Sequence, residues 1–226
     1  MLTVSVAIYK CNIDMFENMI RSVAKHTPQM TRFILIDNGL CDIETIEHLI
    51  RQNVQCKYYI HNSNENLGFG AAHNISYELC DTKYLAVIND DVEFYESWAT
   101  KMIAQLVSGD YIICGITGTP NKLNEVFASE VVSDYKDANY VEGSCFIINH
   151  EKMTSIRNYL FDPNFIIGYF EDTDLGYFLT EEGYELTYVD VDWKHFGGQT
   201  SSKDDKWWYV QKNSAYFRRK WSTKFI

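Results

Sequence analysis

Proline is scarce in this sequence, and long hydrophobic segments are missing from it. Only 3 of the 226 residues are proline and charged residues make up 23%, whereas disordered chains are rich in both. No apolar segment approaches the roughly 20 residues that cross a bilayer, and the first residues lack the basic start and apolar core of a signal peptide. We therefore expect a folded, cytoplasmic protein without a membrane span.

Positive charge is also in short supply. Lys and Arg number 20 against 31 Asp and Glu, which gives a formal net charge of -11. Nucleic-acid binding draws most of its affinity from basic side chains, so a chain this acidic is unsuited to binding bare DNA or RNA. An anionic ligand such as a phosphate would need a cation or backbone amides to hold it here.

The six cysteines lack the close spacing of a metal site. They are scattered along the chain, and no two of them are separated like the paired ligands of a zinc site. Because no export signal is visible, we expect free thiols in a reducing compartment rather than a secreted, disulfide-bonded protein. They are Cys11, Cys41, Cys56, Cys80, Cys114 and Cys145.

The first 110 residues alternate between strand-like and helix-like patterns. Short apolar runs predict strands, and apolar positions three or four residues apart predict helices. This alternation predicts an α/β fold with a mostly parallel central sheet and helices on both faces. Ligands of such sheets bind at the carboxyl ends of the strands. The predicted strands are 1–9, 32–37, 56–60 and 83–88, and the predicted helices are 12–26, 43–50 (capped by Asp42) and 71–79.

The second half has weaker patterns. Strands are expected at 111–118 and 141–148, a helix is expected from about residue 150, and residues 121–140 are polar without clear periodicity. Aromatic and acidic residues mix over 161–183, and the tail from residue 204 carries three of the five tryptophans. No repeat or linker divides the chain, so residues 1–226 are interpreted as one domain.

Two acidic clusters are candidates for chemistry. Asn89-Asp90-Asp91 follows the predicted strand 83–88, where carboxylates can hold a hard divalent cation, although the same residues also fit a solvated turn. In Glu171-Asp172-Thr173-Asp174, neighbouring carboxylates raise one another's pKa, and one of them can serve as a general base. The alternative for the second cluster is a helix start, where the helix dipole favours acids.

Two further features are weaker signals. His195 precedes Gly197-Gly198, a setting that suits a loop near a ligand or metal, although a single histidine is more often structural. The loop Asn66-Leu67-Gly68-Phe69-Gly70 precedes a predicted helix and could present backbone N–H groups to a phosphate. Its spacing is neither a Walker loop nor a dinucleotide-binding fingerprint.

Together, and in this order, these segments resemble the family 2 glycosyltransferases of the GT-A fold. The resemblance covers almost the whole chain, and the tail is similar to the closing helix of rhamnosyltransferase-like members. The segments that carry it are Val4–Tyr9 with Phe33–Gly39, Asn66–Asn74, Leu85–Val92, Phe161–Leu175 with His195, and the tail Gln211–Lys220.

The resemblance implies a hexosyltransferase that moves a sugar, with inversion, from a nucleoside diphosphate sugar to a glycan or lipid-linked hydroxyl. It implies a nucleotide-sugar-binding half, residues 1–110, and a smaller acceptor-side half with the closing helix, residues 111–226. Asp172 matches the catalytic base, and Asp91 and His195 match ligands of Mn2+ or Mg2+. The resemblance places six residues near the nucleotide-sugar: Tyr9, Asp37, Asn66, Gly68, Asn89 and Asp90. It places four others beside the acceptor or in support of the base: Glu142, Gly143, Glu171 and Asp174.

One departure from the family pattern affects the metal. The first position of the DXD motif is Asn89, a neutral oxygen ligand, so weaker metal affinity is expected unless Asp90 compensates. Asn89 also leaves room for a non-catalytic nucleotide-sugar-binding partner of an active transferase, against which Asp172, Asp91 and His195 argue. A nucleotidyltransferase would be expected to carry a basic, glycine-rich phosphate loop, and residues 9–25 have none.

The tail mixes aromatic residues with a basic cluster, Arg218-Arg219-Lys220. We expect a mainly structural helix that packs its aromatic side chains on the domain and leaves its basic side chains in solvent. The alternative is an interfacial helix that meets anionic lipid. Because the two kinds of side chain do not separate into clean faces, we expect at most peripheral contact with the inner face of a membrane.

Overall fold

A seven-stranded sheet forms the centre of the computed structural model, which describes residues 1–116, 140–197 and 203–221. The strand order is β3-β2-β1-β4-β7-β6-β8, and all strands are parallel except β7, which runs antiparallel to β4 and β6. The prediction of a mostly parallel α/β sheet is confirmed. The strands are β1 Leu2–Ile8, β2 Met30–Asp37, β3 Lys57–Asn62, β4 Tyr84–Ile88, β6 Ile113–Ile116, β7 Cys145–Asn149 and β8 Leu186–Val189.

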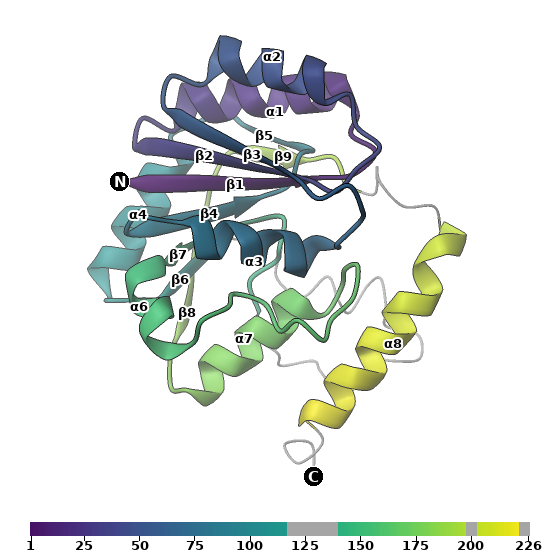
Figure 1. Cartoon of the computed structure of the whole chain (residues 1–226). Coiled ribbons are helices and arrows are strands. Elements are labelled where there is room, and N and C mark those ends of the chain that lie inside the picture. The colour runs from purple at the N-terminus through teal and green to yellow at the C-terminus, as the bar shows by residue number, and fades with distance from the viewer. Residues whose placement is uncertain (117–139, 198–202, 222–226) are drawn as a thin grey trace.

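Helices cover both faces of this sheet (Figure 1). On β4, Ala86 and Ile88 pack into a core with α1, α2 and α4, whereas Leu85 and Val87 pack into a second core with α3, α6 and α7. Side chains cap the starts of two of these helices. Asn12 accepts backbone N–H groups at the start of α1, and Asp42 accepts one at the start of α2. The helices are α1 Ile13–His26, α2 Ile43–Asn53, α3 Phe69–Leu79, α4 Trp98–Ser108, α6 His150–Ile156 and α7 Glu171–Glu181.

The second half of the chain differs in detail from the prediction. The strand expected at 141–148 begins only at Cys145, and the polar stretch 121–140 lies outside the described residues except for Tyr140. A small antiparallel sheet of β5 (Val92–Phe94) and β9 (Trp193–His195) was not expected. His195 therefore ends a strand and does not lie in a flexible loop.

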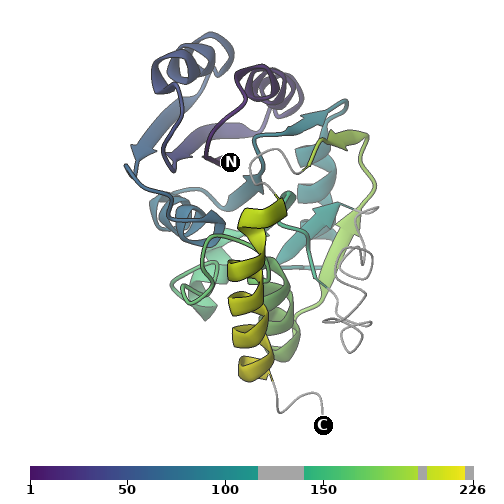
Figure 2. The ribbon, with the colours of Figure 1, turned by 90° about the vertical axis from the view of Figure 1, so that its right-hand side faces the viewer.

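Helix α8 (Lys203–Trp221) packs on the side of the domain formed by α7 and the segment before it. Figures 1 and 2 both show this helix beside α7, away from the helices that cover β1 and β2. The predicted packing of aromatic residues is confirmed, because Tyr209, Phe217 and Trp221 are buried, although Trp207 and Trp208 are exposed. None of the helices in the described part of the chain combines the length and apolar character that a bilayer span requires.

The basic residues of α8 are not all solvated as expected. The ammonium of Lys220 lies 2.7 Å from a carboxylate oxygen of Asp162 and 2.7 Å from one of Asp174. These two side chains are only 6% and 0% exposed, so Lys220 neutralises charges inside the protein. The six cysteines, all within the described residues, are free thiols, as predicted.

Candidate active site

Polar residues gather at the carboxyl ends of the parallel strands, the edge of the sheet that faces the viewer in Figure 2. Strand β1 ends beside Tyr9, β2 ends in Asp37, and β4 leads into Asn89-Asp90-Asp91. Asp37 is 3% exposed, and its Oδ1 accepts a hydrogen bond of 2.8 Å from the backbone N–H of Gly39. Tyr9 is half-buried, with the ammonium of Lys10 over its ring.

The small sheet brings Asp91 and His195 together. Val92 pairs with His195 in the β5–β9 register, which places Asp91 beside the histidine ring. Nε2 of His195 lies 3.3 Å from Oδ1 of Asp91 and 3.3 Å from Nδ2 of Asn89. The carboxyl of Asp90 lies close enough to interact with the thiol of Cys11 in the loop after β1 and with Asp91.

Two neighbouring residues, Glu142 and Gly143, connect this histidine with Asp172. Nδ1 of His195 lies 3.6 Å from Oε1 of Glu142. The next residue, Gly143, donates its backbone N–H to Oδ2 of Asp172 at 3.1 Å, and Oδ1 of Asp172 accepts the N–H of Thr173 at 2.7 Å. Four chain segments that are far apart in sequence therefore converge on one site.

Several ionisable side chains of this site have pKa values far from their ordinary ones. Burial lowers the pKa of His195, but the nearby carboxylates of Asp91 and Glu142 outweigh that effect and raise the pKa to about 9. Burial, reinforced by Asp91, raises the pKa of Asp90 to about 7. Burial also raises the pKa of both Glu171 and Asp172, and the proximity of the two carboxyls raises that of Glu171 further.

The oxygen of Asp91 that faces His195 is suited to a cation. It is buried, and its contact with the ring lacks the alignment of a regular hydrogen bond, so it has an unused lone pair. Among the described residues no group of three or more His, Cys, Asp or Glu side chains is arranged as a metal site. Asp91 and His195 offer one carboxylate oxygen and one imidazole nitrogen, which can supply part of the coordination of a divalent cation.

The loop before α3 is braced against the segment before α7. Gly68 has φ +84°, and a Cβ there would lie 2.5 Å from Cα of Ile167. The carbonyl of Ile167 accepts the N–H of Phe69 at 2.5 Å, and Oδ1 of Asn66 accepts the N–H of Gly68 at 2.9 Å. These two N–H groups are thus already used, contrary to the expectation that this loop offers them to a phosphate.

Asp174 has a different environment from Asp172, although both lie in the first turn of α7. It is 0% exposed, and both of its oxygens are held by α8: Lys220 Nζ lies within 2.8 Å, and Nε1 of Trp221 donates to Oδ1 at 2.9 Å. The expectation that Asp174 contacts the acceptor or supports the base stays a prediction, and the full burial of Asp174 favours the supporting role. Its carboxylate anchors the last helix, and the cluster Glu171–Asp174 is both a helix start and part of the site.

Other residues near the site were not predicted. Asn74 on α3 accepts hydrogen bonds from the N–H groups of Leu160 and Phe161, and donates to the carbonyl of Phe161 at 2.7 Å. Asn213 on α8 makes four hydrogen bonds to the segment before α7. The sequence places Asn74 in the motif Ala71-Ala72-His73-Asn74, but no local signal marks Asn213.

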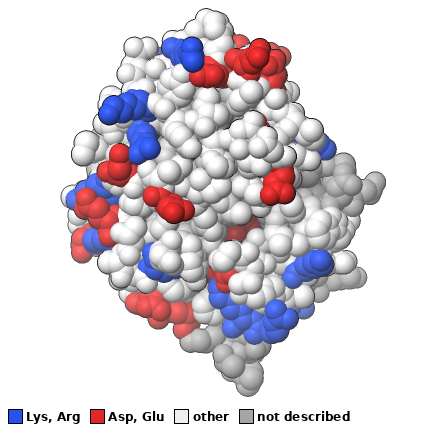
Figure 3. Space-filling view, viewed as in Figure 1, with Lys and Arg blue, Asp and Glu red and all other residues white. Residues whose placement is uncertain are grey.

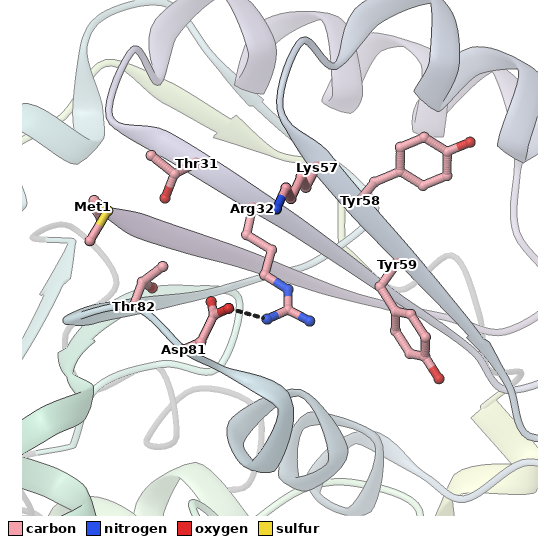
Figure 4. A pocket seen from close by; sticks show the side chains of 8 residues that line it. All are labelled: Met1, Thr31, Arg32, Lys57, Tyr58, Tyr59, Asp81 and Thr82. Atoms are coloured by element: carbon pink, nitrogen blue, oxygen red, sulfur yellow. Dashed lines mark ion pairs between the residues drawn. The ribbon is translucent and has the colours of Figure 1, made fainter.

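A hollow elsewhere on the surface lies at the opposite, amino edge of the sheet (Figure 4). Arg32 and Asp81 form an ion pair of 2.8 Å across it. The acidic residues of the candidate site are absent from its lining, so we do not connect it with the chemistry. Its lining comes from residues at or near the starts of β1, β2, β3 and β4: Met1, Thr31, Arg32, Lys57, Tyr58, Tyr59, Asp81 and Thr82.

Comparison with known families and structures identifies similar proteins. The family profile described as Glycosyl transferase family 2 matches residues 3–162, which include Asn89–Asp91 and Glu142 and end before Asp172. No curated protein matches the sequence. The fold is similar to that of the mannosyltransferase PcManGT from Pyrobaculum calidifontis in complex with GDP-Man and Mn2+, with a TM-score of 0.66 and 12% identity over 84% of this chain and 54% of that chain.

Two further structures have similar folds. GalNAc-T7 with UDP, GalNAc and Mn2+ has a TM-score of 0.69 and 15% identity over 96% of this chain and 47% of that chain. S. aureus TarS 1-349 in complex with UDP-GlcNAc has a TM-score of 0.64 and 12% identity over 95% of this chain and 65% of that chain. The predicted GT-A fold is thereby confirmed, and the chain spans from about half to two thirds of the length of these structures.

Proposed function

The chain belongs to glycosyl transferase family 2, and from this membership we propose that it transfers a sugar, with inversion, from a nucleoside diphosphate sugar to an acceptor hydroxyl. The observation that supports this proposal most directly is the line of contacts Asp91–His195–Glu142–Gly143–Asp172. It joins two side chains suited to a divalent cation with the partly buried carboxylate of Asp172, which accepts two backbone N–H groups. A displacement reaction needs both kinds of group, because a base removes the proton of the attacking hydroxyl and a cation stabilises the charge on the leaving group.

In the proposed reaction, Asp172 accepts the proton of the acceptor hydroxyl through a carboxylate oxygen. The hydroxyl oxygen then forms a bond to the anomeric carbon while the bond from that carbon to the diphosphate oxygen breaks. The leaving nucleoside diphosphate keeps the electron pair, and a single displacement of this kind inverts the anomeric centre. The N–H groups of Gly143 and Thr173 fix the orientation of the Asp172 carboxylate before the acceptor arrives.

Asp91 and His195 would hold the divalent cation, with Asn89 beside them. When bound, the cation neutralises charge that builds up on the leaving diphosphate. This chain needs such a cation because its candidate site is lined by carboxylates and its formal net charge is -11. Asp37 and Tyr9, at the ends of β2 and β1, are proposed to line the base or ribose of the donor.

The proposal predicts metal-dependent nucleotide binding. In the D91A and H195A variants, the part of the affinity for UDP, GDP or dTDP that depends on Mn2+ should fall by about 10-fold or more, as is typical when a metal site loses a supporting group. Isothermal titration of each nucleotide, with Mn2+ or with EDTA, measures this. D172N is the matched control, because it removes an acid of the same site that is not proposed to bind the metal, and its affinity should not change.

If D91A and H195A bind nucleotide as tightly as the wild type, and EDTA has no effect, the enzyme does not depend on a metal. A screen of UDP-, GDP- and dTDP-sugars by thermal shift with Mn2+ identifies the donor, since the melting temperature rises with occupancy. If none of the sugar nucleotides is bound or consumed, the proposed function is wrong.

The acceptor is proposed to be a glycan or a lipid-linked molecule, with at most peripheral membrane contact. Basic side chains gather over the last turn of α8, which contains Arg218, Arg219 and Lys220 (Figure 3). Lys220 is engaged with Asp162 and Asp174, so it does not contribute to a lipid-facing surface. The packing of Tyr209, Phe217 and Trp221 on the domain also supports a structural helix rather than an interfacial anchor.

A further inference from the structure

The segment 165–170, which precedes α7, has an unusual backbone. Ile167, Tyr169 and Phe170 have φ angles of 61°, 73° and 74°, in the left-handed region that non-glycine residues rarely adopt. For Ile167 this is especially unfavourable, because its Cβ is branched. Conformations of this kind persist only where the surrounding structure holds them, and they concentrate at functional sites.

One side chain of α8 holds most of this segment. Oδ1 of Asn213 accepts the N–H of Ile166 at 3.1 Å, and its Nδ2 donates to the carbonyls of Ile166, Gly168 and Tyr169 at 2.9, 2.8 and 3.0 Å. Asn213 is 1% exposed, so these bonds form out of water. A buried amide that binds four backbone groups fixes the path of the chain there, since leaving any of them unpaired would be unfavourable.

The segment touches both sides of the candidate site. On the donor side, the carbonyl of Ile167 accepts the N–H of Phe69, and the Ile167 backbone leaves no room for a side chain at Gly68. On the other side, Phe170 is the N-cap residue directly before α7, and its carbonyl accepts the N–H of Asp174 at 2.8 Å. The direction of the first turn of α7, and with it the place of Asp172, therefore depends on this segment.

We propose that Asn213 is a positioning residue for the transfer reaction. It holds the segment 165–170, which contains the three left-handed residues, and this segment fixes the position of the loop before α3 relative to the carboxylate of Asp172. Asn213 touches none of the reacting groups itself and acts through Ile167 and Phe170. Because Asp172 is the base of the proposed function, the catalytic part of this inference rests on that function. The structural coupling between Asn213, the segment 165–170 and the loop before α3 does not.

Hydrogen exchange measured by mass spectrometry on the whole chain tests the coupling without any substrate. N213A removes all four hydrogen bonds, and N213D keeps the size of the side chain and one acceptor but loses both N–H donors. In both variants, exchange should rise about 10-fold or more in peptides that cover the amide of Phe69 and those of 166–174, a change that corresponds to one or two lost hydrogen bonds. Peptides of β1, β2 and β4 should not change.

S214A is the matched control, because Ser214 is the next residue of α8 and is also buried. Its exchange should stay at the wild-type level in both regions. The inference is overturned if N213D exchanges like the wild type, if S214A changes as much as N213D, or if the amide of Phe69 stays protected while 166–170 opens. The last result would mean that the segment does not transmit its conformation to the donor side.

Turnover of the donor provides the catalytic readout. At a temperature at which circular dichroism shows every variant to be fully folded, N213A and N213D should lose up to about 100-fold in kcat, the size of effect that a small misplacement of catalytic groups produces. S214A should stay near the wild type. A kcat of N213D within twofold of wild type would overturn the positioning role. If the wild-type protein itself turns over no sugar nucleotide, the proposed function fails, while the exchange measurement still decides the coupling.

Discussion

The D172N variant should bind its sugar nucleotide as tightly as the wild type and turn it over about 100- to 10,000-fold more slowly, the range that removal of a general base produces. The physical reason is that Asn has nearly the same shape but cannot accept the proton of the attacking hydroxyl. Donor hydrolysis or transfer, measured with the sugar nucleotide that gives the largest thermal shift, checks the rate. Titration calorimetry checks the binding.

The pH dependence gives an independent check of the same residue. Burial raises the pKa of Asp172 above its ordinary value of 3.8, so the base takes up a proton at a higher pH than an exposed aspartate does. The wild-type rate should therefore fall as the pH drops through this raised pKa, and this acid limb should vanish from the residual activity of D172N. D14N, which changes an exposed acid of α1, should behave like the wild type. Transfer by D172N within a few-fold of wild type would show that another group is the base.

The K220M variant should lose about 3 to 5 kcal/mol of stability at neutral pH, the cost of breaking a buried ion pair by removing one partner. Met keeps the length of the side chain but leaves the carboxylates of Asp162 and Asp174 without their cation. Hydrogen bonds from Lys220 and Asn164 overcome the effect of burial and hold the pKa of Asp162 at about 2, so this carboxyl is ionised in the folded protein. Urea unfolding, followed by circular dichroism, measures the change.

Lys101 offers a matched control for this effect. It also pairs with a carboxylate, that of Glu96 at 2.6 Å, but its side chain is 48% exposed. Exposed pairs contribute only about 0 to 1 kcal/mol, so K101M should change the stability little. A loss in K220M no larger than that in K101M would mean that water already screens the charges of Asp162 and Asp174. The double variant D162N/K220M should recover part of the loss, because it buries one charge fewer.

The sequence predicted those parts of the fold and site that local patterns determine. Asp37 and Asn89-Asp90-Asp91 were placed at strand ends because the apolar runs before them mark buried strands, and the carboxyl ends of parallel strands share an edge. Helix α4 was not predicted, although its buried residues Trp98, Met102 and Leu106 recur at helical spacing. The signal for this helix was therefore present in the sequence.

Other parts of the site depend on contacts between distant segments. Asn89 and His195 lie 106 residues apart, and only the pairing of β5 with β9 brings His195 to the end of β4. In the last turn of α8, Lys220 meets Asp162 and Asp174, and no local sequence pattern separates it from the neighbouring Arg218 and Arg219. Asp172 and Asp174 likewise share one helical turn, and tertiary packing alone gives them different environments.

The position of α8 at the far end of the described chain has a consequence for the order in which the protein can mature during synthesis. Domains fold from the amino end as the ribosome releases the chain, so the sheet strands β1 to β4 are available long before Asn213 and Lys220 leave the exit tunnel. Until then the segment 165–170 lacks its clamp, and Asp162 and Asp174 lack their cation. A nascent chain that stalls before α8 is thus expected to expose the segment 165–170 without the hydrogen bonds of Asn213 and to leave two carboxylates without their cation.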